Sequence, residues 1–125
     1  MQIEVKGRNL PITDELREVV TRRFEKVSKQ VSELAVLEVE LFEERNPANP
    51  DSQVAEATLH LKGVTLRAHE ASRDLKHSIN LISDELARQV KRHRDKRRKR
   101  REQRAAAAGS PGIVDEGPGE AAPAW

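Results

Sequence analysis

Hydrophobic and polar residues alternate in four short segments of the chain, the pattern typical of strands with one buried face. Their apolar members are Ile3 and Val5; Leu37, Val39 and Leu41; Ala55, Ala57, Leu59 and Leu61; and Val64, Leu66 and Ala68. The last two segments flank Lys62-Gly63, which predicts a hairpin. Because each segment is polar on its other side, we expect a sheet that helices cover on one face and water wets on the other.

Apolar residues at three- and four-residue spacing predict an amphipathic helix after the first strand. Asn9-Leu10-Pro11-Ile12-Thr13 breaks that strand, and Thr13 suits a helix N-cap. Asp14 and Glu15 follow in the first turn, where the helix dipole favours acidic side chains. The apolar stripe consists of Leu16, Val19, Val20, Phe24, Val27 and Val31, so this helix is predicted to end near residue 31.

A second amphipathic helix is predicted to begin near Ser72 or Asp74. Its apolar stripe consists of Leu75, Ile79, Ile82, Leu86 and Val90. The stripe stops at Val90, but residues 91–104 contain no Gly or Pro. We therefore expect the helix to continue as a charged extension and to fray before Ala105.

The predicted order of elements is β-α-β-β-β-α, with a turn-rich loop at 46–51. This order indicates an α+β fold in which two helices pack on one face of a four-stranded sheet. We expect residues 1–104 to form one domain with a basic helical extension. Residues 105–125 are rich in Gly, Pro and Ala, which predicts a disordered tail or linker.

The net charge of +2 conceals a strong asymmetry along the chain. Residues 1–90 carry 13 Lys and Arg against 16 Asp and Glu, a net charge of −3. Residues 91–104 carry 10 basic and 2 acidic side chains, or +8, and residues 105–125 carry three acids, or −3. So dense a basic run opposes folding unless an anion relieves it. It predicts a polyanionic partner, nucleic acid before anionic membrane.

Basic residues on both predicted helices lie outside the apolar stripes. They are Arg22, Lys26 and Lys29 on the first helix, and Arg88, Lys91, Arg92 and Lys99 on the second. Lys and Arg suit phosphate because they bring charge, and for Arg a donor fork, to its oxygens. For the first helix alone, a solvated charged face is an adequate explanation, because Glu18, Glu25 and Glu33 are nearby.

The aromatic content favours recognition of folded rather than single-stranded RNA. The aromatic residues are Phe24, Phe42 and Trp125, and Phe24 lies on the apolar stripe. Single-strand binders stack bases on aromatic side chains of a sheet, and this sheet offers at most Phe42. We therefore expect contacts to the backbone and shape of structured RNA.

The sequence favours no enzyme, metal site, cofactor or small-molecule substrate. It has no cysteine, no Gly-rich phosphate loop and no nucleophile elbow. The histidines are residues 60, 69, 77 and 93. His60 and His69 could face each other across the hairpin, but solvated surface histidines are the simpler interpretation. The chain has no apolar run long enough for a membrane span, so a cytoplasmic location is expected.

Three separated segments, in order, carry a resemblance to a known family. The chain resembles the ribosome hibernation-promoting factor family, also called ribosome-associated inhibitor or sigma-54 modulation proteins. The segments that carry this resemblance are MQIEVKGRNLPITDELREVV, TLHLKGVTLRA and DLKHSINLISDELARQVKRHRDK. The match covers residues 1 to about 97, and LARQVKRHRDK is its most specific part. The resemblance implies a domain that binds the small ribosomal subunit between head and body. There it would overlap the messenger and transfer RNA sites and silence the ribosome in starvation or stationary phase.

Family positions that contact ribosomal RNA map onto the basic residues of this chain. The resemblance places Arg22, Lys26, Arg88, Lys91, Arg92, Arg94 and Lys96 in this role, which adds Arg94 and Lys96 to the candidates found above. The family's Asp-Met-Tyr at the start of the last helix is Asp74-Leu75-Lys76 here, so stacking by that tyrosine is lost. Ribosome dimerisation would require a further C-terminal domain, which longer family members have.

Two alternatives to a ribosome inhibitor use the same basic residues. One is a general binder of double-stranded RNA or DNA without ribosomal specificity. The other is a protein-interaction module whose basic segment recognises an acidic partner. Competition separates them, because a shape-specific binder should prefer the small subunit over excess duplex RNA.

Overall fold

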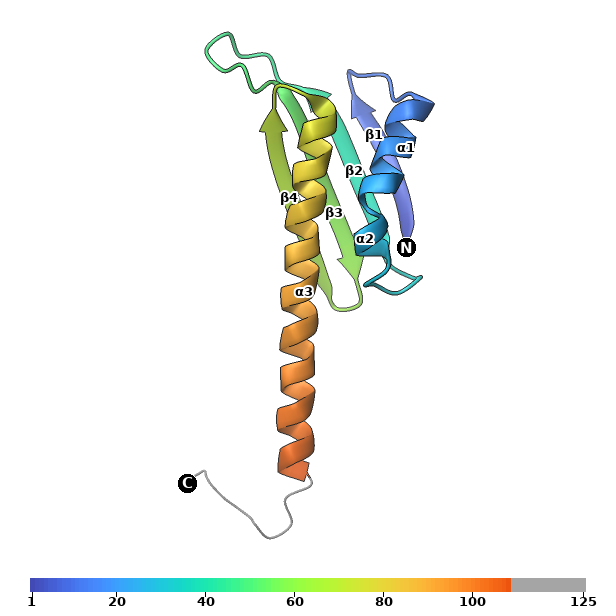
Figure 1. The fold of residues 1–125 in the computed structure, drawn as a ribbon, viewed down its shortest axis with the longest axis vertical. Helices are drawn as coiled ribbons and strands as arrows, with labels where there is room; N and C mark the ends of the chain where they lie inside the picture. Colours follow the sequence, from blue (N-terminus) through green and yellow to red (C-terminus); the bar gives the residue numbers. More distant parts are fainter. Residues whose placement is uncertain (109–125) are drawn as a thin grey trace. The chain divides into compact units, whose positions relative to one another are not determined.

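The computed structural model of the protein describes residues 1–108 and has the predicted α+β fold (Figure 1). Its elements are β1 (Gln2–Arg8), α1 (Asp14–Arg23), α2 (Glu25–Ser28), β2 (Val36–Glu43), β3 (Gln53–Leu61), β4 (Val64–Ser72) and α3 (Leu75–Ala108). The chain divides into two units, the first comprising residues 1–91 and the second beginning at Arg92. The boundary therefore falls within α3, close to the point where its apolar stripe stops.

The four strands form one sheet in the order β1-β2-β3-β4. β1 pairs with β2 in parallel, and the two later pairings are antiparallel. β3 and β4 are joined at the predicted Lys62-Gly63 turn, where Gly63 has a φ of 82°. Glycine fits this position because a Cβ is strained at positive φ. The predicted loop after β2 is also present, with Asn46 and Asn49 bridged.

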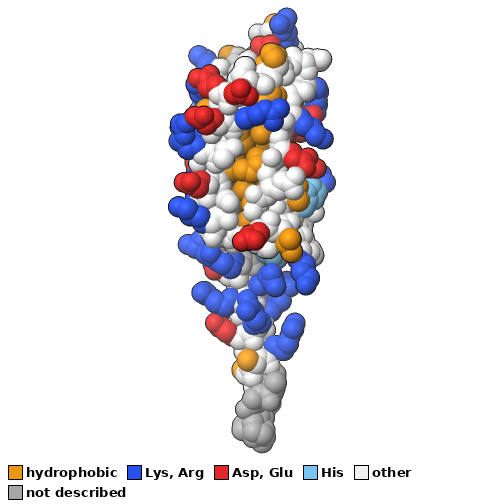
Figure 2. Space-filling view, turned by 90° about the vertical axis from the view of Figure 1, so that its right-hand side faces the viewer, with side chains coloured by type: hydrophobic (Ala, Val, Ile, Leu, Met, Phe, Trp, Pro, Cys, Tyr) orange, Lys and Arg blue, Asp and Glu red, His pale blue; other side chains and the backbone are white. Residues whose placement is uncertain are grey.

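α1, α2 and the part of α3 before Arg92 lie over one face of the sheet (Figure 1). Most of the alternating strand residues and of the apolar stripes belong to the core or pack against it, as predicted. Val64, beside the hairpin turn, is half-buried and lies outside this cluster. Fully buried members include Val20, Phe24, Val27, Leu37, Leu41, Leu59, Ile79, Ile82 and Leu86. The apolar side chains of β1, Ile3 and Val5, are only half-buried against this core. Figure 2 shows that hydrophobic side chains also reach the surface on the face in view.

The first predicted helix is interrupted, which the apolar spacing did not indicate. Phe24 separates α1 from α2 with φ −91° and ψ 6°, outside the helical region. Its N–H still bonds to the Val20 carbonyl, and its own carbonyl accepts hydrogen bonds from Val27 and Ser28. The helix is thus interrupted at a fully buried aromatic residue whose own N–H and carbonyl both remain hydrogen-bonded. α2 ends at Ser28, before the predicted end near residue 31.

α3 begins where predicted and ends later than predicted. Asp74 precedes it and accepts a hydrogen bond from the Lys76 N–H through its side chain. The expectation of fraying before Ala105 was wrong, because the helix continues to Ala108. Alanine has the highest helix propensity, and residues 105–108 are all alanine, which explains the extension. Residues 109–125 of the predicted tail lie outside the described residues.

Candidate nucleic-acid interface

A shallow hollow with predominantly basic walls lies between the first helical segments and the start of α3. Its volume is about 410 Å³. It is lined by Arg22, Arg23, Glu25, Lys26, Lys29, Gln30 and Asn80, so four cations surround one carboxylate. The structure therefore brings together the three predicted basic residues of the first helix, although α1 and α2 are separate elements. Arg23 is an addition that the sequence interpretation missed.

The cations of this hollow differ in their intramolecular partners. Arg22 Nη2 lies 2.9 Å from Glu18 Oε1, one turn earlier on α1. Lys26 instead forms an ion pair with Asp84, which connects α2 to α3. The Lys26 and Asp84 side chains are 46% and 40% exposed, so water and an incoming ligand can reach the pair. The pair therefore adds little to stability.

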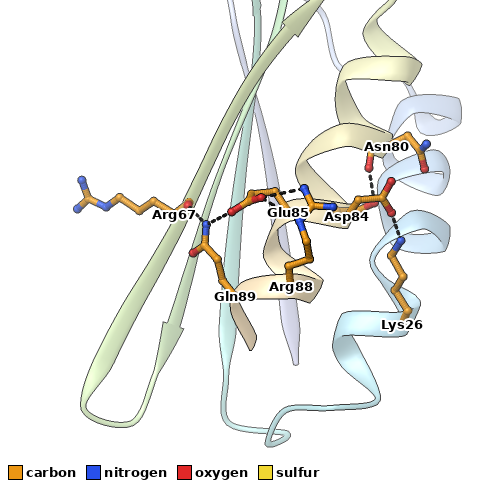
Figure 3. A network of polar contacts seen from close by, with 8 residues as sticks. Lys26, Arg67, Asn80, Asp84, Glu85, Arg88 and Gln89 are labelled. Carbon is orange, nitrogen blue, oxygen red and sulfur yellow. Dashed lines mark hydrogen bonds and ion pairs between the residues drawn. The ribbon is translucent and has the colours of Figure 1, made fainter. Parts of the chain in front are cut away.

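The exposed surface of α3 before Arg92 carries a second set of charged side chains. Arg88 and Lys91 are both exposed, as predicted. Arg88 donates from Nε and Nη2 to Glu85 Oε1, at 3.2 and 2.8 Å. Gln89 donates to the other oxygen of Glu85 at 2.9 Å and to the Arg67 carbonyl on β4 at 2.8 Å (Figure 3). Glu85 is thus held at both carboxylate oxygens.

The second unit carries the remaining predicted basic residues on the continuous helix α3. Arg92, Arg94, Lys96 and Lys99 are all exposed. Figure 2 shows Lys and Arg side chains crowding this segment on the face in view. Arg98 lies 3.9 Å from the Asp95 carboxylate and 4.0 Å from the Glu102 carboxylate, so both of these contacts are weak. Most of the +8 charge of residues 91–104 therefore faces solvent.

The uncovered face of the sheet offers no exposed aromatic platform within residues 1–108. Phe42 is only 6% exposed, and the Arg8 guanidinium covers its ring at 4.2 Å from the centroid. A hydrogen bond from Arg8 to Glu40 raises the pKa of the guanidinium above its ordinary value. Base stacking on the sheet is therefore disfavoured, in agreement with the sequence interpretation.

His60 and His69 share this uncovered face but do not face each other. His60 lies opposite Thr65 and His69 opposite Glu56, so the two rows are about 13 Å apart along the hairpin. Each ring nitrogen instead lies 3.4 Å from a glutamate, Glu38 for His60 and Glu56 for His69. The suggestion that they meet across the hairpin was wrong, because their registers differ by four residues.

The described residues present neither a metal-binding cluster nor a membrane-crossing helix. Within residues 1–108, no group of three or more His, Asp or Glu side chains is placed to hold a metal ion. In the same range, no helix combines the length and apolar character that a bilayer span requires. His93 is half-buried, and its Nε2 has no hydrogen-bond partner among the residues that the structure describes.

Similar proteins of known sequence carry a consistent name. The chain is 34% identical over 96 residues to the ribosome hibernation promoting factor of Salmonella typhimurium, covering 77% of this chain and 96% of that protein. It is 32% identical over 97 residues to the ribosome hibernation promotion factor of a Picosynechococcus strain. That match covers 77% of this chain and 50% of the relative, so the chain spans about half the length of that protein.

Two solved structures have the same fold as this chain, and a family profile matches its sequence. The N-terminal domain of Thermus thermophilus Protein Y superposes with a TM-score of 0.64 at 30% identity, covering 74% of this chain and 99% of that domain. A ribosomal subunit interface protein from Coxiella burnetii shares the fold, with a TM-score of 0.63 at 19% identity and 76% and 99% coverage. The profile of the family described as sigma 54 modulation protein / S30EA ribosomal protein matches residues 3–98. The chain belongs to this family.

Proposed function

We propose that this chain is a cytoplasmic ribosome hibernation factor that acts without enzymatic chemistry. It binds the small ribosomal subunit in the channel for messenger and transfer RNA, and it blocks translation in starvation or stationary phase. Membership of the family and the names of the relatives support this role. The observation that carries it is the basic hollow between the helices, which is lined by Arg22, Arg23, Lys26 and Lys29 among other residues.

Phosphate recognition follows from the exposure and spacing of these cations. Exposed Lys and Arg side chains release condensed counterions when they meet phosphates, which supplies affinity without reading sequence. A concave surface of this kind fits a curved or folded phosphate backbone better than a straight one, which is the source of the shape selectivity in this proposal. We propose that ribosomal RNA fills it, and that Arg88 and Lys91 contact neighbouring phosphates.

The basic segment from Arg92 supplies the larger part of the electrostatic attraction. Four proposed contacts, Arg92, Arg94, Lys96 and Lys99, lie on it and are exposed. A helix with cations on many sides gains affinity from any nearby phosphate rather than from one geometry. We propose that it anchors the protein in the RNA-lined channel, while the hollow of the first unit provides specificity for shape.

A general structured-RNA binder is the second candidate, and the even distribution of cations on the segment 91–104 favours it. Such a protein would bind duplex RNA as well as it binds the ribosome. Ribosome dimerisation forms no part of either proposal, because the matched region corresponds to half of the Picosynechococcus relative.

Sedimentation with purified small subunits tests the proposed function. We expect co-sedimentation that survives excess duplex RNA and is lost when the subunits are first loaded with messenger and transfer RNA. Binding that disappears with duplex competitor would favour the general RNA binder. Binding to neither would favour a module for an acidic protein partner.

A charge-reversal variant tests the assigned residues. Arg88→Glu combined with Arg92→Glu should abolish subunit binding and leave the fold intact, because neither residue belongs to the buried core. The matched control is Arg45→Glu with Lys62→Glu, an equal charge change at exposed positions in the loop after β2 and in the hairpin turn. Retained binding of the first variant at physiological salt would refute the site assignment.

A further inference from the structure

Two consecutive carboxylates stand within the proposed RNA-binding face of the first unit, where a phosphate-binding surface would be expected to carry only cations. Asp84 and Glu85 follow one another on α3, and Figure 3 shows them directed to opposite flanks of the helix. Asp84 turns toward Lys26 on α2, and Glu85 turns toward Arg88 and Gln89. A polyanion that contacts Lys26 or Arg88 therefore comes close to one of these carboxylates.

The two carboxylates cannot readily move away from an incoming phosphate. Glu85 accepts hydrogen bonds at both oxygens, and its side chain is only 28% exposed. The Gln89 amide that holds it is itself anchored on the Arg67 carbonyl of β4. Asp84 has a short side chain and pairs across the helices with Lys26. By contrast, Glu18 beside Arg22 is 74% exposed and can swing aside, so it imposes no comparable barrier.

We propose that Asp84 and Glu85 are specificity-determining residues of the RNA interface, an inference that rests on the proposed function. They hold Lys26 and Arg88 in position and oppose ligands that present only a regular array of phosphates. Such a ligand must break two ion pairs and place phosphates beside fixed negative charges, which is repulsive. A folded RNA that offers 2′-hydroxyl or base amino donors between its phosphates satisfies cations and carboxylates together. The two carboxylates thus favour folded RNA by weakening the binding of ligands that present only regularly spaced phosphates.

The test compares a short DNA duplex, as a uniform polyanion, with the small ribosomal subunit. Asp84→Asn and Glu85→Gln remove one charge each and keep a hydrogen-bonding side chain of the same size. Each should raise affinity for the DNA duplex about five- to tenfold, the effect of one unit charge at contact distance in water. Affinity for the small subunit should change by less than about twofold, because each variant loses the repulsion of phosphates together with the hydrogen bonds that the folded RNA donates to the carboxylate.

The matched controls carry the same charge change elsewhere in the first unit. Asp51→Asn and Glu44→Gln alter exposed acids of the loop after β2, outside the helical face. Screening beyond about 10 Å should keep their effect on duplex affinity below about twofold. An equal gain in the controls would show a general charge effect and overturn the proposal. No gain in either α3 variant, or an equal gain for subunit and duplex, would also overturn it.

Salt dependence provides a readout that a purely structural role would not change. Freeing one cation for phosphate contact should steepen the slope of log affinity against log salt for the duplex by about 0.9. Failure of the proposed function is recognised separately, because the unaltered protein would then show no preference for the small subunit. The duplex measurements would still decide whether the two carboxylates oppose uniform polyanions.

Discussion

Leu86 is fully buried within the core cluster, on the same apolar stripe of α3 as Ile82 and Val90. Replacing it with alanine leaves a cavity that the surrounding helices and strands close only in part. We expect Leu86→Ala to lower the free energy of unfolding by about 2–5 kcal/mol in urea titrations. Leu34→Ala is the control, since Leu34 is 90% exposed and its loss should cost less than about 0.5 kcal/mol. Equal stability of the two variants would contradict the assigned core.

Gly7, in β1, stands at a position where a larger side chain has no space. A Cβ at this position would lie 2.0 Å from the Leu10 carbonyl oxygen and 3.0 Å from the Ile12 side chain. The first of these atoms is backbone and cannot move without shifting the turn that leads into α1. We expect Gly7→Ala to lower the thermal midpoint and to reduce the free energy of unfolding by about 1–3 kcal/mol. A midpoint equal to that of the unaltered protein would show that the turn tolerates the shift.

At the scale of elements, the start of α1 is stabilised by the N-cap residue Thr13, which the sequence predicted. The Thr13 side-chain oxygen accepts a hydrogen bond from the Leu16 N–H at 3.2 Å. Thr13→Ala removes this acceptor from the helix start and should cost about 1 kcal/mol in the free energy of unfolding. Thr21→Ala serves as control within the same helix, because the Thr21 hydroxyl bonds only the Arg17 carbonyl. It should change stability by less than about 0.5 kcal/mol. A Thr13 variant as stable as the Thr21 variant would refute the cap.

Periodicity predicted the elements of this fold because each has one apolar side. Strand alternation identified all four strands, and three- to four-residue spacing identified the helical regions, including the buried Ile79, Ile82 and Leu86. The break at Phe24 escaped the sequence interpretation, because Phe24 keeps the apolar spacing while its backbone leaves the helix. Neither Gly nor Pro marks this position, so the interruption arises from packing in the folded state.

Local spacing also explains which contacts of the candidate site were predictable. The exposure of Lys26 and Arg88 follows from their places outside the apolar stripes. The partnership of Lys26 with Asp84 joins residues 58 positions apart, and no pattern within one helix reveals it. The same holds for Arg8 over Phe42, which required the register of β1 against β2. Sequence thus located the basic surface, and tertiary structure showed which of its charges are paired.

At the scale of the whole molecule, charge is divided unequally between the folded first unit and the basic segment. The first unit, residues 1–91, carries 14 basic and 16 acidic side chains, or −2, and residues 92–104 carry 9 basic and 2 acidic side chains, or +7. Long-range attraction to RNA therefore comes mainly from the segment. The slope of log affinity against log salt measures the number of cations that meet phosphates. Comparing the slopes of variants that lose cations from the segment with those of variants that lose cations from the first unit therefore separates the two contributions.

Replacing Arg94, Lys96 and Lys99 together with Gln should make the slope of log affinity against log salt for small-subunit binding less steep by about two to three. Stability should remain unchanged, because all three side chains are exposed. The comparison variant replaces Lys6, Arg45 and Lys62 with Gln, an equal loss of charge from the first unit away from its helices, and should preserve the slope. If both variants lower the slope equally, net charge rather than the basic segment governs association. If only the first does, phosphates lie along the segment in the complex, as the proposed anchoring role requires.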